Sequence, residues 1–272
     1  MTTPTAPIKM ITIDLDGTLL RSDGTVSDHT VEVLQAARKK GVVVAISTGR
    51  MYTTASPYGK RLGLGDSPMI LFAGGLIQTN ETKKKLFEHP IPVDDTLALL
   101  ALAKQHDWQI QTYIDDVLRV AKDEPLIREY EAATHCKAVI CGDAFYTTVP
   151  SGSNKMLLRG YSHEELVEKK ALIEKELPGR YMICFSEPTF LEVMPKGIDK
   201  GVGIEKLGEV YGIDVENIMA LGDSQNDIDM LKAAGFPVVM ANASDEIKQY
   251  AKHITLSNNE DGVAAAVEQF VL

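Results

Sequence analysis

Short apolar segments alternate with amphipathic segments near the start of the chain. Apolar residues at 8–13, 42–47 and 69–72 predict three strands, and a segment from Ser27 or Asp28 to about Lys40 has the cap and the spacing of a helix. The run VVVAIS at 42–47 is continuously apolar and β-branched, which is typical of a strand covered on both faces. Before the third strand we expect a helix with a break near Pro57.

The same alternation returns at the far end of the chain. The predicted strand NIMAL ends at Leu221, and PVVM and HITL follow it at 237–240 and 253–256. Alternating strands and helices predict an α/β fold with a doubly wound, mostly parallel sheet, similar to a Rossmann core. The helices expected in this part cover residues of about 200–211, 226–234, 245–251 and 262–271.

The middle of the chain has a different pattern. It predicts a hairpin around TNETKKK at 79–85, a helix near 94–106 and alternating strands such as WQIQTYI at 108–114. Ser162 followed by Glu165 is a capping-box signal for a helix that ends near Glu176. We therefore predict an α+β domain at 78–192, inserted into a core made of residues 1–77 and 193–272.

Composition limits the partners and the location. A net charge of -10 and a pI of about 5.1 argue against binding to nucleic acid or to an anionic membrane, because both repel an acidic protein. No segment approaches the ~18 apolar residues of a membrane span, and the first residues lack the features of a signal peptide, so we expect a cytoplasmic protein. The 3 cysteines form no CxxC pair and the 6 histidines are scattered, which disfavours a disulfide framework, a zinc site and a Ser-His-Asp triad.

Two aspartates follow the first predicted strand, in the stretch DLDGT at 14–18. Alternate residues of a strand point the same way, so Asp14 and Asp16 are expected to share one side. Two neighbouring carboxylates are costly unless a cation, a proton or hydrogen-bond donors offset their repulsion. Ligands of open α/β sheets bind at the carboxyl ends of the strands, so the partners of these aspartates are expected in stretches that follow other core strands.

Three further polar stretches are candidates. STGR at 47–50 follows the second strand, DKG at 199–201 precedes a helix, and GDSQND at 222–227 follows NIMAL. With DLDGT they supply carboxylates, a lysine, small hydroxyls and glycine-rich turns, which metal-assisted phosphoryl transfer requires. In this chemistry Asp14 would attack phosphorus, and Asp16 would protonate the leaving oxygen and later deprotonate the attacking water.

The same chemistry needs a hard cation and positive charge near the phosphoryl group. Asp14 and Asp223 would give oxygen ligands to Mg²⁺, with Asp227 as a support behind them. Thr48 would donate its hydroxyl to a phosphoryl oxygen, and Lys200 would place its charge beside the phosphoryl group and the nucleophile. Lys196 also precedes a glycine, but Lys200 fits its stretch better.

These motifs, in this order, closely resemble those of the haloacid dehalogenase-like superfamily of phosphohydrolases. The resemblance extends from about Ile8 to Val271, and the long insertion resembles the type IIB cap of the Cof-type branch. It implies a Rossmann-like core with an α+β cap, Mg²⁺ as cofactor and a small phosphorylated metabolite as substrate, with a sugar phosphate the first expectation.

The resemblance also implies roles for single residues. Asp16 would offer its backbone carbonyl to Mg²⁺ besides acting as acid and base. The chain departs from the Cof-type pattern at Ala73, where asparagine is common, and at Ala241, where glycine is usual. The implied metal-binding residues are Asp14, Asp16, Asp223 and Asp227, and the implied phosphate- or substrate-binding residues are Leu15, Gly17, Thr48, Gly49, Arg50, Lys200 and Asn226.

Two other functions stay open from the sequence. A phosphomutase is one, since a type IIB cap is also found in phosphomannomutases; release of inorganic phosphate without a sugar bisphosphate would argue against it. A non-enzymatic regulator that binds phosphosugars is the other, and the presence of both Asp14 and Asp16 disfavours it.

Overall fold

The computed structural model describes residues 3–272, which form two compact units. The first unit contains the chain up to Arg50, Ala55–Glu88 and Asp199–Leu272, and the second contains Met51–Thr54 and His89–Ile198. The insertion thus begins and ends later than the predicted 78–192. The shift arises because the predicted hairpin pairs with the sheet of the first unit, whereas the strand at Phe190–Pro195 belongs wholly to the sheet of the second.

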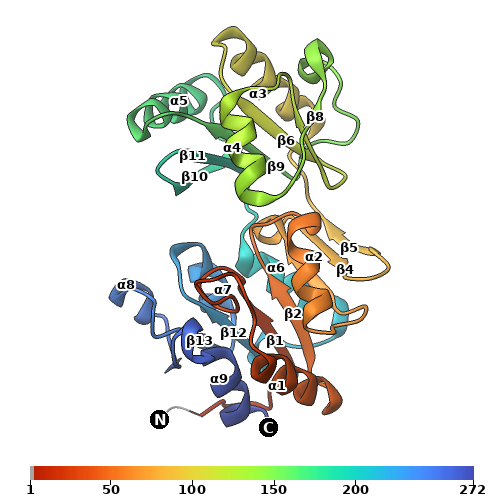
Figure 1. Cartoon of the computed structure of the whole chain (residues 1–272), viewed down its shortest axis with the longest axis vertical. Coiled ribbons are helices and arrows are strands. Elements are labelled where there is room, and N and C mark those ends of the chain that lie inside the picture. The colour runs from red at the N-terminus through yellow and green to blue at the C-terminus, as the bar shows by residue number, and fades with distance from the viewer. Residues whose placement is uncertain (1–2) are drawn as a thin grey trace. The chain divides into compact units, whose positions relative to one another are not determined.

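The first unit is built on an eight-stranded sheet in the order β14-β13-β12-β1-β2-β3-β4-β5 (Figure 1). The strands from β14 to β3 are parallel, and the hairpin of β4 and β5 continues the sheet in antiparallel fashion. This confirms the predicted doubly wound, mostly parallel sheet. Its strands are β1 (Met10–Ile13), β2 (Val43–Ser47), β3 (Pro68–Leu71), β4 (Leu76–Thr79), β5 (Lys85–Glu88), β12 (Ile218–Gly222), β13 (Phe236–Val239) and β14 (His253–Ile254).

Helices cover this sheet because its strands are apolar on both faces. Met10 packs with residues of α6 and α7 in one buried cluster, while Ile11 and Ile13, which point to the other face, are equally buried. Helices α6 and α7 pack against each other, and so do α1 and α9. The helices of this part are α1 (Asp28–Lys39), α2 (Tyr52–Arg61), α6 (Lys200–Tyr211), α7 (Ile228–Ala233), α8 (Asp245–Lys248) and α9 (Gly262–Phe270).

Local signals set some of the helix ends. The hydroxyl of Ser27 accepts a hydrogen bond from the Thr30 amide and so caps α1, as its position in the sequence predicted. The expected break near Pro57 is absent, because α2 runs through this residue. Proline removes only one donor, and the turns on either side keep their backbone bonds, from Thr54 to Met51 and from Leu62 to Tyr58.

The second unit has a six-stranded sheet in the order β10-β11-β9-β6-β7-β8, antiparallel except for β7 with β8. Apolar residues of α3 and α5 cover one face, and α4 lies on the other, where Tyr130 contacts Tyr113 and Phe190. Its elements are α3 (Val93–Gln105), β6 (Ile110–Ile114), β7 (Val117–Val120), α4 (Pro125–Thr134), β8 (Val139–Ile140), β9 (Lys155–Arg159), α5 (His163–Glu176), β10 (Tyr181–Glu187) and β11 (Phe190–Pro195).

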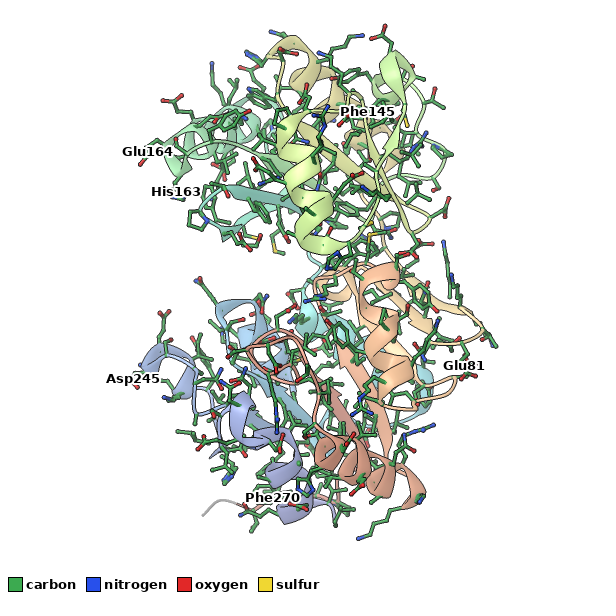
Figure 2. All side chains as sticks on the ribbon, viewed as in Figure 1. Glu81, Phe145, His163, Glu164, Asp245 and Phe270 are labelled. Atoms are coloured by element: carbon green, nitrogen blue, oxygen red, sulfur yellow. The ribbon has the colours of Figure 1, made fainter. Side chains whose placement is uncertain are left out.

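Side chains divide between core and solvent as expected for such layers. Phe145 is buried in the core of the second unit, and the ring of Phe270 packs on Phe236 in the first. Acidic side chains such as Glu81 and Glu164 point away from the ribbon (Figure 2). Among residues 3–272, no helix is both long and apolar enough to span a membrane.

Candidate active site

Parallel pairing brings the predicted motifs to one edge of the large sheet. Strand β1 lies between β12 and β2, with Ile13 in register with Leu221 on one side and Ile46 on the other. The loops that follow β12, β1 and β2 therefore begin next to one another at this edge of the sheet. The Asp14 amide donates to the Leu221 carbonyl over 3.0 Å, and the Thr48 amide donates to Ile70 over 2.9 Å, so both positions are fixed by backbone bonds.

Lys200 is the cation at the centre of this edge. It is fully buried at the start of α6, whose N-cap Asp199 accepts from the Val202 amide. Its Nζ lies 2.6 Å from Asp14 Oδ1 and 2.7 Å from Asp227 Oδ1, and 3.4 Å from the side-chain oxygen of Asn226. One lysine thus links the nucleophile predicted after β1 to the loop that follows β12.

The charges in this cluster perturb each other strongly. Burial raises the pKa of Asp14 well above its ordinary value, the charge of Asp227 raises it further, and Lys200 opposes both effects. Burial and then Asp227 raise the pKa of Asp223 to about 6. Burial alone would lower the pKa of Lys200, but its two aspartate partners outweigh this and hold the pKa above its usual value. The site therefore has more negative charge than its lysine balances.

Three carboxylates of the cluster are close enough to share a cation. One oxygen each of Asp14, Asp223 and Asp227 lies within 4.8 Å of the others. Asp227 already has donors on both oxygens, because Oδ2 accepts from the amides of Asp223 and Ser224 at 3.1 Å each. Asp14 Oδ2 has no hydrogen bond among residues 3–272. Asp14 thus has the oxygen most open to a metal. Asp223, whose oxygens contact only neutral side chains, is a better candidate than Asp227, which is held by a lysine and two backbone amides and shapes the loop.

Asp223 is held by two residues that the sequence analysis did not assign. The Thr18 hydroxyl donates to its Oδ1 over 3.0 Å, and the Asn242 amide group lies 3.4 Å from its Oδ2 and donates to the Gly17 carbonyl over 2.8 Å. Gly17 has a φ of +79°, and a Cβ there would lie 2.3 Å from Asp223 Oδ2. The motif therefore requires glycine at this position for both conformation and space.

Asp16 occupies a different environment from Asp14. Strand β1 ends at Ile13, so both aspartates lie in the following turn and the expected strand alternation does not apply to them. The Asp16 side chain is 60% exposed and accepts two hydrogen bonds from Arg50, at 2.9 and 2.5 Å. The Arg50 guanidinium in turn lies 5.4 Å from the centre of the Tyr58 ring. The Asp16 carboxylate is outside the acidic trio.

The remaining residues named in the sequence analysis differ in their burial and in the groups through which they make hydrogen bonds. Thr48 is buried, and its hydroxyl oxygen accepts from the Arg50 amide over 3.2 Å. The Leu15 side chain is fully buried, so only its backbone is available to a ligand. Ala73, one of the two departures from the Cof-type pattern, has a φ of +50° and its amide donates to the Thr48 carbonyl over 3.0 Å. Ala241 makes a backbone bond to Leu256.

Comparison with known families decides the affiliation. The model of the haloacid dehalogenase-like hydrolases matches residues 11–267, which include every site residue named above. The chain belongs to this family. The 5-amino-6-(5-phospho-D-ribitylamino)uracil phosphatase YcsE of Bacillus subtilis is 32% identical over 97% of the chain and 96% of that protein.

Solved structures agree with this result. A Thermotoga maritima protein has a TM-score of 0.90 and 27% identity, covering 97% of this chain and 98% of its own. A sugar phosphatase of subclass IIB has a TM-score of 0.79 and 26% identity, over 96% and 98% of the two chains. The protein is therefore a haloacid dehalogenase-like phosphatase that acts on small phosphorylated substrates, as its motifs implied.

Proposed function

We propose that this phosphatase hydrolyses phosphate monoesters of sugars and sugar alcohols, and that Asp14 carries the phosphoryl group between its two steps. The observation that supports this most is the state of the Asp14 carboxylate. Lys200 holds Oδ1 at 2.6 Å, whereas Oδ2 has no hydrogen bond within residues 3–272. A buried carboxylate that is fixed through one oxygen and free at the other is suited to attack phosphorus.

In the first step Asp14 Oδ2 bonds to phosphorus and the ester oxygen leaves, taking a proton from Asp16. In the second step water attacks the same phosphorus, gives its proton to Asp16 and releases Asp14 with inorganic phosphate. Because Arg50 binds both oxygens of Asp16, this pair has to separate when substrate enters. Arg50 is then free to bind a phosphate or substrate oxygen.

The phosphoryl oxygens need donors in addition. We assign this role to the turn Thr48–Gly49–Arg50 after β2 and to Lys200, whose charge also steadies the nucleophile. Backbone groups of Leu15 and Gly17 and the side chain of Asn226 complete the set proposed for phosphate and substrate.

Magnesium is the proposed cofactor, and the residues fit it. Carboxylate oxygens are ligands that Mg²⁺ prefers, and one oxygen each of Asp14, Asp223 and Asp227 lies within 4.8 Å of the others. Burial, and after it the charge of Asp227, raises the pKa of both Asp14 and Asp223, so a cation beside them would be favourable. Asp14, Asp223 and the backbone carbonyl of Asp16 would hold the ion, with Asp227 behind them. When bound, Mg²⁺ would offset the charge of these carboxylates and of the phosphate dianion.

The proposed substrate class draws support from the comparisons. The name of the Bacillus subtilis relative places its phosphate on a ribityl chain, and one solved neighbour is described as a sugar phosphatase. Both substrates carry phosphate on a polyhydroxylated carbon chain. We propose that the second unit acts as the cap and supplies the contacts that select this leaving group.

A phosphate-release assay tests the proposal. Purified protein is incubated with hexose, pentose and pentitol phosphates, with nucleotides and with an organic diphosphate, each with EDTA or with Mg²⁺. We expect release from the polyol phosphates with Mg²⁺ and without any sugar bisphosphate, and inhibition by Ca²⁺, whose larger and looser coordination would misplace the nucleophile. Full activity in EDTA would contradict the metal assignment, and preference for nucleotides or the diphosphate would contradict the substrate class.

A further inference from the structure

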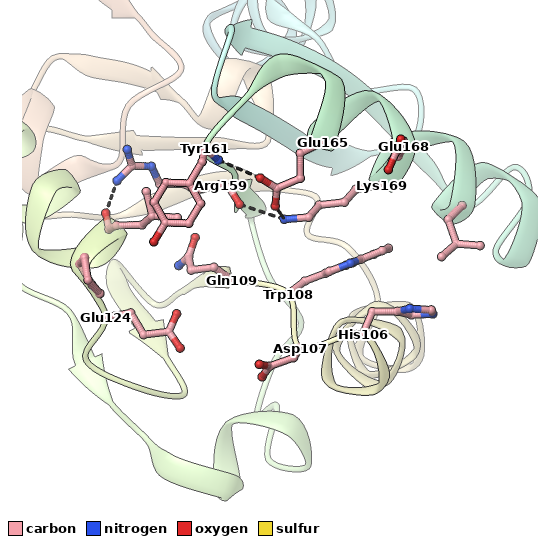
Figure 3. Close-up of a pocket in the computed structure, with 13 residues that line it drawn as sticks. His106, Asp107, Trp108, Gln109, Glu124, Arg159, Tyr161, Glu165, Glu168 and Lys169 are labelled. Carbon is pink, nitrogen blue, oxygen red and sulfur yellow. Dashed lines mark hydrogen bonds and ion pairs between the residues drawn. The ribbon is translucent and has the colours of Figure 1, made fainter.

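The second unit contains a pocket of about 700 Å³, and Figure 3 shows the side chains that line it. Its two buried cations are already engaged. Lys169 Nζ lies 2.6 Å from Glu165, and the Arg159 guanidinium donates to the Leu126 carbonyl. These two side chains are therefore not available to a phosphate group. Every residue that lines the pocket lies outside the unit that contains the carboxylate cluster, so the contacts that extend this cluster are those of the first unit.

Asn242 lies in the turn that follows β13, close to the proposed metal-binding residues. A backbone bond fixes this turn, because the Met240 amide donates to the Gly222 carbonyl over 3.1 Å. Gly222 directly precedes Asp223 in the chain. The parallel pairing of β12 with β13 thus brings the Asn242 side chain to the loop that contains Asp223.

The side-chain amide of Asn242 connects two segments of the proposed metal site. Its Nδ2 donates to the Gly17 carbonyl over 2.8 Å and lies 3.4 Å from Asp223 Oδ2. Asp223 is a proposed ligand, and Gly17 directly follows Asp16, whose backbone carbonyl is another. A single NH₂ group therefore joins the turn after β1 to the loop after β12, and these two segments have to hold one ion at a fixed spacing.

Asn258 fixes the direction of this amide. Its backbone N–H can only donate, and it donates to Asn242 Oδ1 over 3.0 Å, so the NH₂ end of Asn242 has to face Gly17 and Asp223. The Asn258 side chain is buried, and its Nδ2 donates to the Leu20 carbonyl over 2.8 Å. Two asparagines in contact with each other thus hold the DLDGT segment, one at Gly17 and one at Leu20.

The Asn242 contacts are suited to positioning rather than to stabilising the fold. Asn242 is exposed, so water can replace the hydrogen bonds of its NH₂ group at little cost when the side chain is removed. A hydrogen bond to a metal ligand has a different effect, because it orients that ligand. Loss of such a partner typically lowers metal affinity by about 10- to 100-fold.

We propose that Asn242 is a positioning residue for the magnesium site, where it holds Asp223 and the turn at Asp16 and Gly17 at the spacing that the ion requires. This role rests on the proposed cofactor. Without the Asn242 amide the two segments are not pre-organised, so Mg²⁺ binds more weakly. At saturating Mg²⁺ the ligands regain their places and the rate of turnover returns.

Calorimetric titration of the metal-free, full-length protein with Mg²⁺ tests this role. Asn242→Ala should raise the Kd about tenfold. Asn259→Ala is the matched control, because Asn259 is also exposed and binds the same segment beyond the motif, at the backbone amide and hydroxyl of Ser22, over 3.0 and 2.9 Å. The control should bind Mg²⁺ as the parent does, and both metal-free variants should melt near the parent's temperature.

A kinetic measurement separates positioning from a general structural defect. With a sugar phosphate that the parent hydrolyses, Asn242→Ala should need about tenfold more Mg²⁺ for its half-maximal rate and reach the parent's kcat at saturating Mg²⁺. The proposal is overturned if Asn242→Ala binds Mg²⁺ as tightly as the parent, if Asn259→Ala weakens binding equally, or if metal-free Asn242→Ala melts well below Asn259→Ala. Absence of Mg²⁺ binding by the parent itself would contradict the proposed cofactor, and this role of Asn242 with it.

Discussion

Replacing Lys200 by methionine should destabilise the metal-free protein severely. The lysine is fully buried, and its Nζ lies 2.6 Å from Asp14 and 2.7 Å from Asp227. Methionine retains most of the apolar stem but leaves two carboxylates in the interior without their cation. Removing one partner of a buried ion pair costs about 3–5 kcal/mol, which is a large part of the ~5–15 kcal/mol that keeps a typical protein folded.

Urea unfolding followed by circular dichroism measures this loss. With a denaturant slope of about 3 kcal/mol per molar, the midpoint should fall by about 1 M or more. A carboxyl group whose pKa is raised by folding destabilises the folded protein when it is ionised, and this penalty disappears as the pH falls through the folded-state pKa. The deficit of Lys200→Met should therefore be larger near pH 7.5 than near pH 5, because Asp14 takes up a proton more readily at the lower pH.

A second lysine of α6 provides the matched control. Lys206 pairs with Glu209 at 2.8 Å on the surface, where an ion pair contributes about 0–1 kcal/mol. Lys206→Met should therefore leave the unfolding midpoint nearly unchanged at both pH values. If Lys200→Met unfolds at the same urea concentration as Lys206→Met, the buried lysine does not stabilise the two carboxylates.

Further predictions concern the loop that holds Asp223. Gly17→Ala should abolish Mg²⁺-dependent activity and lower the melting temperature more than Gly24→Ala does. Both glycines have a φ near +79°, but only at Gly17 would the methyl group clash with Asp223. Equal losses of melting temperature in calorimetry would refute the clash. Asp223→Asn should stabilise the metal-free protein near pH 7.5, because folding raises the pKa of the wild-type carboxyl to about 6 and its ionised form is then unfavourable. The gain should be smaller near pH 5, where the wild-type carboxyl is protonated. A gain in the free energy of unfolding that grows at low pH, measured with urea, would contradict this prediction. The parent should bind Mg²⁺ more weakly below pH 6 in calorimetric titrations, since protons compete for Asp223; a pH-independent affinity would exclude Asp223 as a ligand.

The sheet and the meeting of the motifs could be predicted from the sequence because both follow from local pattern. Continuous apolar runs such as 42–47 specify buried parallel strands, and parallel strands place the residues after their ends at one edge. Asp14, Thr48 and Asp223 were therefore expected together before any side-chain position was known.

Other features depend on contacts that no local pattern encodes. Asn242 follows the short strand β13, and its position against Gly17 and Asp223 results from the packing of separate loops. The ion pair of Asp16 with Arg50 could likewise not be predicted, because the sequence does not specify which of several polar residues contacts Asp16. The boundary of the insertion was misplaced because a hairpin signal specifies two paired strands but not the sheet that they join, and β4 pairs with β3 of the core.

The most direct measurement is the identification of the phosphorylated residue. Wild-type protein and the variants Asp16→Asn and Asp14→Asn are each mixed with Mg²⁺ and an intact sugar phosphate that the wild type hydrolyses. The reactions are quenched in acid, and the protein is digested for mass spectrometry. A phosphoryl group on Asp14 is expected in the wild type during turnover, with more of it in Asp16→Asn, where the water step lacks its base, and none in Asp14→Asn. Turnover of the Asp14→Asn variant at the wild-type rate, or a phosphoryl group on any other residue, would contradict the proposed role of Asp14.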